Sequence, residues 1–326
     1  MPTDAADIIL FGPTKPTILN GLKAHRLTQA TTLQEVADLS PAIAATVRGV
    51  GVAGLVKMDR AMFARFPKLE IVSTFGVGYD HIDTACARER GIVVTNTPDV
   101  LTEETADTAL ALLLCTARDF INGERYVRDG EWAKKPFPLS KATLRDRTVG
   151  IVGMGRIGQA IARRLEAMKV PVVYHSRRKN AEVANKYYAN LMEMARDVDT
   201  LVVITPGGAE TQNLINAEVL KALGSNGILI NAARGSVVDE DALIAALKNG
   251  TIMAAGLDVF VKEPNVPQDL IAMKNVVLFP HLGSASVYTR NAMDQLVADN
   301  LNAWFAGKAP LTPVAETPPS ISKFRS

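Results

Sequence analysis

The chain has 326 residues, which is enough for two domains that each bury a hydrophobic core. Hydrophobic residues make up 48% and charged residues 21%, a composition that is typical of globular proteins and excludes disorder of the whole chain. The chain has 36 basic and 34 acidic residues, so its formal net charge is only +2. Because this balance gives no strong overall field, we expect no nucleic acid or membrane partner.

The N-terminal residues and the cysteines indicate a cytoplasmic protein. Asp4 and Asp7 stand where a signal peptide would carry Lys or Arg. The most apolar helical run, residues 108–117, is too short to span a bilayer. Cys86 and Cys115 lie in apolar helical surroundings without the spacing of metal ligands. We therefore predict two small buried side chains and no metal site.

The first hundred residues alternate short apolar, β-branched runs with helical patterns. Strands are predicted within residues 7–12, 25–31, 47–54, 69–75 and 91–97. A long helix follows over residues 101–120, with apolar residues on one face and acidic residues in its first turn. This alternation favours a first α/β unit with a parallel sheet.

The next segment, residues 121–147, shows no clear periodicity. Loops of this length are uncommon inside a compact domain unless they have a function. Trp132 and Phe137 suggest an anchor on another surface, such as a second subunit. Packing of the segment on its own domain is an equally open alternative.

A second alternation begins at Val149. Strands are predicted within residues 149–153, 171–176, 200–205, 227–232, 253–260 and 276–281, with amphipathic helices between them and a last helix over 286–305. Parallel strands with helices on both faces follow from such a pattern. The predicted fold class is therefore α/β, with two doubly wound parallel-sheet domains.

A glycine motif opens the second unit. Gly153, Gly155 and Gly158 form the pattern GxGxxG directly after a strand and at the start of a helix. The first glycine permits a tight turn, the second lets a pyrophosphate approach the backbone, and the third lets the helix pack on the strand. The helix N-terminus adds amide donors and a favourable dipole. The motif predicts a bound dinucleotide.

The residues after the next strand indicate which dinucleotide is used. In such units an Asp or Glu about 20 residues further on holds the ribose hydroxyls of NAD. Here Ser176 occupies that position, followed by Arg177, Arg178 and Lys179. A carboxylate would repel a 2′-phosphate, whereas a hydroxyl and guanidinium groups can bind one. We therefore predict NADP(H), preferred over NAD(H).

Three further residues with catalytic chemistry follow predicted strands. Arg234 comes after residues 227–232, Glu263 after 253–260, and His281 ends the strand-like run 276–281. Ligands of open α/β sheets bind beyond the carboxyl ends of the strands, so we expect these side chains on one edge. Imidazole is the side chain whose pKa lies nearest to neutral pH, and a neighbouring carboxylate favours its charged form.

These motifs together resemble one family. "FGVGYDHID", "VGMGRIG", "NAARGSVVDEDAL", "AAGLDVFVKEP" and "FPHLGSAS" are similar to the NAD(P)-dependent D-2-hydroxyacid dehydrogenases over nearly the whole chain. The basic segment and the ending Pro310-Leu311-Thr312-Pro313 point to the glyoxylate/hydroxypyruvate reductase branch.

The resemblance implies a fold and a subunit arrangement. We expect a flavodoxin-like substrate domain from residues 1–100 and 287–326, a Rossmann coenzyme domain from residues 101–286, and an active site in the interdomain cleft. A homodimer is also implied.

The resemblance further implies roles for single residues. Arg234 would bind the carboxylate of a small 2-keto acid, His281 would be the acid/base, and Glu263 would keep His281 protonated. Backbone amides at Gly76, Val77 and Gly78 would form a second carboxylate clamp, and Leu55 would line the pocket. The predicted cofactor residues are Thr105, Gly153, Met154, Gly155, Arg156, Ile157, Gly158, Ser176, Arg177, Arg178, Thr205, Pro206, Ala232, Ala233, Asp258, His281 and Gly283. The other histidines, His25, His81 and His175, are predicted to be structural or solvated.

Alternatives stay open at this point. Some relatives are cofactor-sensing corepressors that keep the same Arg, Glu and His, although no long partner-binding extension is evident here. A phosphoglycerate dehydrogenase usually carries a C-terminal regulatory domain, and only 326 − 281 = 45 residues follow His281. A formate dehydrogenase would pair its His with Gln, whereas this chain has Glu263. The preferred 2-keto acid is not evident, because apolar pockets discriminate small side chains only modestly.

Overall fold

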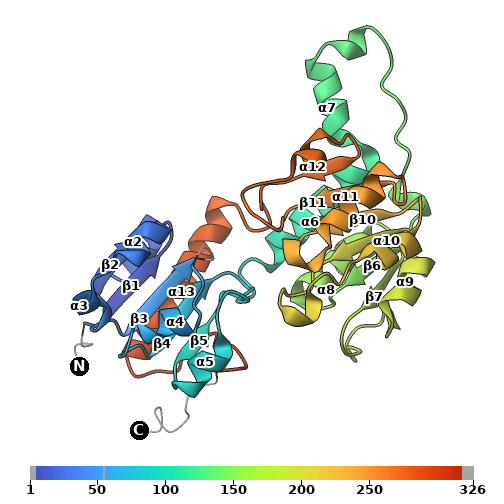
Figure 1. Ribbon diagram of the computed structural model, residues 1–326. Coiled ribbons are helices and arrows are strands. Elements are labelled where there is room, and N and C mark those ends of the chain that lie inside the picture. Colours follow the sequence, from blue (N-terminus) through green and yellow to red (C-terminus); the bar gives the residue numbers. More distant parts are fainter. Residues whose placement is uncertain (1–4, 54–55, 318–326) are drawn as a thin grey trace. The chain divides into compact units, whose positions relative to one another are not determined.

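The computed structural model describes residues 5–53 and 56–317, which form two compact units (Figure 1). Unit 1 consists of residues 1–101 and 286–326, and unit 2 of residues 102–285. Each unit is built on one parallel sheet covered by helices. The prediction of two parallel-sheet α/β domains is therefore confirmed.

Unit 1 holds a five-stranded sheet in the order β2-β1-β3-β4-β5. This order is that of flavodoxin-like folds, in which ligands bind beyond the carboxyl ends of the strands. The strands are β1 (Asp7–Phe11), β2 (Arg26–Ala30), β3 (Gly49–Ala53), β4 (Ile71–Phe75) and β5 (Val93–Thr95). The helices are α1 (Pro16–Gly21), α2 (Leu33–Ala37), α3 (Pro41–Ala44), α4 (Arg60–Ala64), α5 (Thr84–Glu89) and α13 (Val287–Phe305).

The two faces of this sheet bury different hydrophobic clusters. Ile9 and Phe11 of β1 belong to the cluster on one face, and Ile8 and Leu10 to the cluster on the other, as the two-residue period of a strand requires. The second cluster also contains Val297, Ala298, Leu301 and Trp304 of α13. The chain therefore returns after unit 2 to complete the core of unit 1.

Unit 2 holds a seven-stranded parallel sheet in the order β12-β11-β10-β9-β6-β7-β8. Its strands are β6 (Val149–Val152), β7 (Val172–His175), β8 (Lys186–Tyr188), β9 (Thr200–Val203), β10 (Ile228–Asn231), β11 (Ala254–Leu257) and β12 (Val276–Leu278). Its helices are α6 (Thr102–Arg118), α7 (Phe120–Arg128), α8 (Arg156–Ala167), α9 (Leu191–Asp197), α10 (Ala217–Leu223), α11 (Glu240–Lys248) and α12 (Gln268–Ala272). Short 3-10 turns are η1 (Glu131–Ala133), η2 (Leu144–Asp146), η3 (Ala209–Thr211) and η4 (Gly235–Val237).

Strand β8 was not predicted from the sequence. It lies at the edge of the sheet and pairs only with β7, from Val173–Lys186 to His175–Tyr188. Of its three residues only Tyr188 is buried, so it lacks the continuous apolar run that marks the inner strands β6, β9 and β10.

The prediction of an irregular loop over residues 121–147 is wrong in its first part. Helix α7 occupies Phe120–Arg128 and projects from the body of unit 2 (Figure 1). None of its residues is buried, and therefore it has no core-facing stripe from which periodicity could be read. Asp119, in the left-handed conformation with φ 56°, separates α7 from α6.

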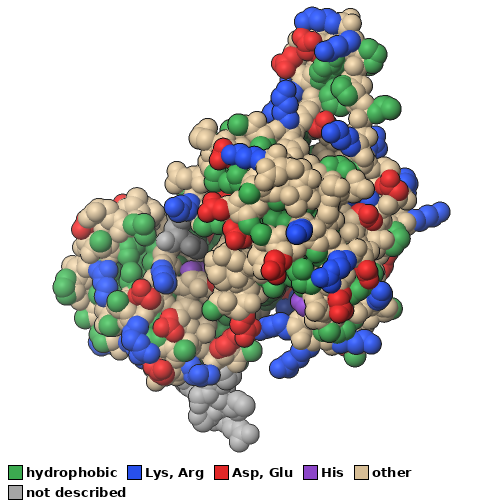
Figure 2. Space-filling model, turned by 45° about the vertical axis from the view of Figure 1, so that its right-hand side comes forward, with side chains coloured by type: hydrophobic (Ala, Val, Ile, Leu, Met, Phe, Trp, Pro, Cys, Tyr) green, Lys and Arg blue, Asp and Glu red, His purple; other side chains and the backbone are tan. Residues whose placement is uncertain are grey.

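The segment after α7 folds back onto it. The ring of Phe137 lies 5.2 Å from that of Tyr126 in an edge-to-face contact, and the Tyr126 hydroxyl donates to the carbonyl of Lys135. Trp132 and Val127 remain exposed, by 65% and 56%, and Figure 2 shows hydrophobic side chains on this projecting arm, residues 119–143. Phe137 thus packs on its own arm, whereas Trp132 is largely exposed.

The cysteines and the remaining histidines have structural surroundings. Cys86 is buried, while Cys115 is only half-buried, and both are free thiols. His25 hydrogen-bonds Asn302, His81 hydrogen-bonds Thr74, and His175 hydrogen-bonds the carbonyl of Tyr188. Among the described residues, no helix has the length and apolarity needed to cross a membrane.

Candidate active site

The glycine loop between β6 and α8 has the geometry that a pyrophosphate requires. Gly153 has φ 107°, and a Cβ there would lie 2.9 Å from the amide nitrogen of Thr205. A Cβ on Gly158 would lie 2.1 Å from the carbonyl oxygen of Gly153. A Cβ on Gly155, the N-cap of α8, would meet nothing within 4 Å. The loop is therefore closely packed on its inner side and open beside Gly155, where a phosphate can approach the helix N-terminus.

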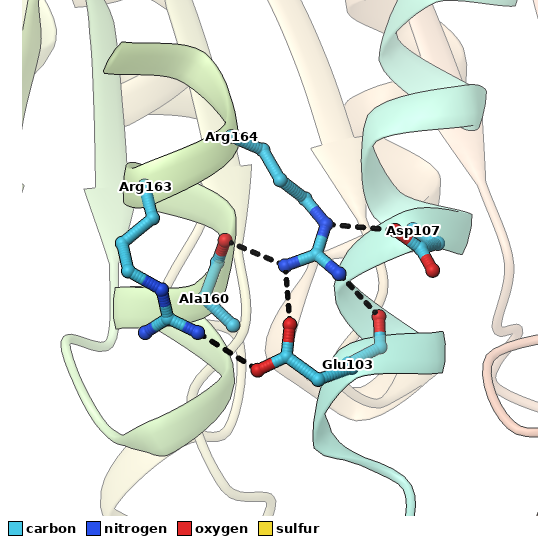
Figure 3. Close-up of polar contacts among 5 residues, drawn as sticks. All are labelled: Glu103, Asp107, Ala160, Arg163 and Arg164. Carbon is cyan, nitrogen blue, oxygen red and sulfur yellow. Dashed lines mark hydrogen bonds and ion pairs between the residues drawn. The ribbon is translucent and has the colours of Figure 1, made fainter. Parts of the chain in front are cut away.

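An ion-pair cluster ties α8 to the first turn of α6 (Figure 3). Arg164 of α8 contacts the carboxylate of Asp107 at 2.7 Å and that of Glu103 at 2.8 Å, and it also donates to the carbonyl of Glu103 at 3.1 Å. Arg163 reaches the other oxygen of Glu103 at 2.7 Å. The first turn of α6, which carries the buried Thr105, is thereby fixed against the helix that follows the glycine loop.

The basic segment lies directly after β7, at the carboxyl edge of the sheet. Ser176 donates its hydroxyl to the carbonyl of Arg178 at 2.6 Å, which closes a tight turn. Arg177 is 80% exposed and forms an ion pair with Glu210 at 2.5 Å. A hydroxyl and two guanidinium groups thus stand where the second strand of a dinucleotide domain meets the adenosine ribose.

Arg234 follows β10 and is positioned by the last residue of that strand. The buried side chain of Asn231 accepts from the amide of Ala233 at 3.1 Å and donates to the carbonyl of Arg234 at 3.0 Å. The guanidinium of Arg234 donates to the carbonyl of Ala233 at 2.8 Å. The backbone around Arg234 is therefore fixed by the sheet.

His281 and Glu263 come together although they are 18 residues apart. Nδ1 of His281 lies 2.7 Å from Oε2 of Glu263, while Oε1 accepts from the amide of Phe260 at 3.0 Å. Burial favours a higher pKa for Glu263, but the hydrogen bonds from His281 and Phe260, together with the charge of Arg234, lower this pKa below its usual value. The carboxylate is therefore ionised and fixes the imidazole ring through Nδ1.

The loop that carries His281 is held by Asp258. His281 has φ 54°, a left-handed conformation that is unfavourable for a residue with a side chain. The two carboxylate oxygens of Asp258 accept from the amides of Leu282 at 2.6 Å and Gly283 at 2.9 Å, and its carbonyl accepts from the amide of His281. Burial raises the pKa of Asp258, against the two amides that favour its charged form. These contacts stabilise the loop.

Comparison with known proteins identifies the family. Residues 110–283, more than half of the chain, match the model of the "D-isomer specific 2-hydroxyacid dehydrogenase, NAD binding domain". The chain belongs to the D-isomer specific 2-hydroxyacid dehydrogenase family. This confirms the family expected from the sequence motifs.

Several relatives of this dehydrogenase cover most of its length. It is 48% identical over 256 residues to glyoxylate/hydroxypyruvate reductase A of Arabidopsis thaliana, covering 78% of this chain and 82% of the relative. It is 47% identical over 264 residues to a glyoxylate reductase of Pyrococcus horikoshii, covering 78% and 79%. A solved structure, that of an NADPH-dependent glyoxylate/hydroxypyruvate reductase from Sinorhizobium meliloti with NADP and malonate, shares 51% identity and a TM-score of 0.93, covering 97% of this chain and 98% of that one.

The fold of the dehydrogenase brings several predicted cofactor residues together. A Cβ on Gly283 would lie 3.2 Å from Oδ2 of Asp258 and 3.5 Å from Cγ2 of Thr105. The buried Ala232 and Ala233 directly follow the neighbouring strand β10. Thr205 and Pro206 follow β9, and their hydrogen-bonded loop closes through Thr211, whose hydroxyl donates to the carbonyl of Pro206 at 2.8 Å.

Two predicted cofactor residues have surroundings that limit their role. The side chain of Met154 is buried in a hydrophobic cluster of unit 2, so only its backbone can face a ligand. Both carboxylate oxygens of Asp258 are used by the His281 loop, which makes Asp258 a support for that loop.

Arg156 is exposed and Ile157 half-buried at the start of α8.

The predicted carboxylate clamp of unit 1 follows β4. The amide of Gly76, whose φ is 132°, donates to the hydroxyl of Thr97 at 2.9 Å, and the carbonyl of Val77 accepts from Asn96. The amide of Gly76 is thus already used, which leaves those of Val77 and Gly78 for an anion. Leu55 lies outside the described residues.

Sequence reasoning missed several residues that position the site. They act on backbone groups or on segments that are distant in the chain, and they are Asn231, Thr97, Glu210 and Asp258, the last as a support of the His281 loop. The only signal for Asn231, Thr97 and Asp258 was their place at or just after strand ends, and Glu210, in η3, had none. Within residues 5–53 and 56–317, no cluster of His, Cys, Asp and Glu side chains has the arrangement of a metal site.

Proposed function

We propose that this chain reduces small 2-keto acids, such as glyoxylate and hydroxypyruvate, to D-2-hydroxy acids with NADPH. The observation that carries the proposal is the 2.7 Å hydrogen bond between His281 and Glu263, next to the charge of Arg234 on the same unit. Relatives named as glyoxylate and hydroxypyruvate reductases add support. An imidazole, a carboxylate and a guanidinium supply a proton donor, its counter-ion and a carboxylate ligand.

The proton and the hydride reach the keto group separately. Bound NADPH supplies the hydride, which adds to the keto carbon. Protonated His281 donates from Nε2 to the keto oxygen, and Glu263 stabilises the imidazolium before the transfer. The product is the 2-hydroxy acid, and His281 regains its proton from solvent. One hydride and one proton together account for the two-electron reduction.

Arg234 would bind the substrate carboxylate and polarise the keto oxygen. Its planar guanidinium matches a carboxylate with two parallel hydrogen bonds. The amides of Val77 and Gly78 are proposed as the second ligand of the same carboxylate. Leu55 stays a predicted pocket residue.

We predict that Glu263→Gln changes the pH profile of reduction. Since the pKa of Glu263 is lowered, the carboxylate is ionised throughout neutral pH, and its charge favours the protonated imidazole. An uncharged amide removes that support, so His281 gives up its proton more readily. The pH at which kcat for reduction declines is therefore expected to move downward. An unchanged profile, measured from pH 5 to 10, would contradict this role.

The basic turn after β7 supports NADPH as the cofactor. Ser176, Arg177 and Arg178 offer a hydroxyl and two guanidinium groups, with no carboxylate at the position of Ser176. The S. meliloti relative is described as NADPH-dependent and was solved with NADP. A 2′-phosphate is therefore the proposed ligand of this turn.

Steady-state kinetics with NADPH and NADH and a panel of 2-keto acids tests the proposal. The wild-type enzyme is expected to have the higher kcat/KM with NADPH. Arg177→Ala should raise the dissociation constant of NADPH about tenfold, because one charged hydrogen bond is lost. The dissociation constant of NADH should change little. Equal kcat/KM values for the two cofactors in the wild type would refute the preference.

We also propose a homodimer formed through the arm of residues 119–143. The arm exposes Phe120, Val127, Trp132 and Leu139, and several large apolar side chains exposed on one segment are typical of protein interfaces. Sedimentation equilibrium at micromolar concentration should give twice the 35.0 kDa of the chain, and a monomer mass would contradict it. A cytoplasmic location stays a prediction from the sequence.

A further inference from the structure

The ion pair between Arg177 and Glu210 joins two loops at the carboxyl edge of the unit 2 sheet. Nη1 of Arg177 and Oε2 of Glu210 are 2.5 Å apart. Arg177 belongs to the turn after β7, and Glu210 to the 3-10 turn η3 after β9. Both side chains are largely exposed, 80% and 73%.

This pair extends across the end of β6. In the sheet β6 lies between β9 and β7, and neighbouring strands are about 4.8 Å apart, so the two loops start about 10 Å from each other. The glycine loop follows β6 and therefore lies between them. In a dinucleotide domain the adenosine ribose binds at the end of the strand after the glycine motif, here β7. Arg177 and Glu210 consequently meet over the position expected for the adenosine.

Both loops are internally fixed, which limits how far either charge can move away. The hydroxyl of Thr211 donates to the carbonyls of Pro206 and Gly208, at 2.8 Å and 3.2 Å, and closes the loop that carries Glu210. On the other side, Ser176 closes the turn of Arg177 and Arg178, and the Tyr187 hydroxyl donates to the carbonyl of Ser176 at 3.1 Å. The backbone that carries each charge is therefore held in place, and only the two exposed side chains can move apart.

We propose that Glu210 is a specificity-determining residue, which occupies Arg177 in the free enzyme and is displaced by the 2′-phosphate of NADPH. The inference rests on the proposed function, namely that Arg177 binds this phosphate. An exposed ion pair is weak, whereas a phosphate dianion forms short, charge-assisted and bidentate hydrogen bonds with a guanidinium group, so the exchange is favourable. Glu210 nevertheless lowers the affinity for the phosphate, because its own pair must break and the two anions repel each other. NADH has no such phosphate and leaves the pair intact. Glu210 thus reduces the preference for NADPH over NADH.

Glu210→Gln tests the inference, since it removes the charge and keeps the size. The probes are 2′,5′-ADP, which carries the 2′-phosphate, and 5′-AMP, which does not, with titration calorimetry as the measurement. We expect 2′,5′-ADP to bind about two- to fivefold more tightly to the variant and 5′-AMP to bind equally well. Weaker or unchanged binding of 2′,5′-ADP overturns the proposal, as does an equal gain for both nucleotides.

The double variant and a matched control separate this inference from the proposed function. In the Arg177→Ala background, Glu210→Gln should no longer strengthen 2′,5′-ADP binding to the same extent, because the competed guanidinium is absent. Asp269→Asn removes another exposed carboxylate from its 2.9 Å pair with Lys248, at the end of α11, and should leave both affinities unchanged. If Arg177→Ala alone does not weaken 2′,5′-ADP, the proposed phosphate site fails. If it does but Glu210→Gln has no effect, only the role of Glu210 fails.

Discussion

Replacing His281 by alanine is expected to lower kcat for 2-keto acid reduction by about two to four orders of magnitude, the usual contribution of a general acid. His281 is fixed by Glu263 at 2.7 Å and by the backbone contact with Asp258, so its imidazole has a defined position. NADPH binding, measured by nucleotide fluorescence, should be retained, because the glycine loop and the turn after β7 are unchanged.

His25→Ala is the matched control for this prediction. His25 hydrogen-bonds Asn302 within unit 1 and has no part in the proposed chemistry, so kcat of this variant should stay near the wild-type value. Added imidazole should partly restore the turnover of His281→Ala by supplying the missing proton donor. Near wild-type turnover of His281→Ala without imidazole would refute its role.

The substitution Arg234→Lys is expected to lower kcat/KM for glyoxylate by about 100- to 1000-fold. Lysine keeps the charge but loses the two parallel hydrogen bonds of the guanidinium, each worth about 1.5–3 kcal/mol with a charged partner. Because Arg234 is also proposed to polarise the keto oxygen, kcat should fall together with a rise of KM. Steady-state kinetics with saturating NADPH gives both constants.

The same substitution elsewhere provides its control. Arg196 is exposed on α9, and Arg196→Lys should leave kcat and KM unchanged. If Arg234→Lys raises KM and leaves kcat unchanged, Arg234 binds the substrate equally well in the ground state and the transition state. That result would exclude its action on the keto oxygen.

Much of the fold was predictable because its signals are local. Inner strands such as β6, β9 and β10 are continuous apolar runs, and the glycine loop is defined within six residues of sequence. Arg234, Glu263 and His281 were predicted as site residues from their positions after strands, since parallel strands bring their carboxyl ends to one edge. The edge strand β8 and the exposed helix α7 were missed, because neither buries a full hydrophobic face against unit 2.

The sequence by itself therefore determined the chemical groups of the site, the order of the elements that carry them, and the absence of an acid at Ser176. The tertiary structure decided which groups meet: Glu263 with His281, Asp258 with the amides after His281, and Arg177 with Glu210. The reason is physical. Strand and helix patterns depend on neighbours along the chain, whereas a hydrogen bond or ion pair needs two groups within about 3 Å of each other. Only the packing of separate segments sets that distance.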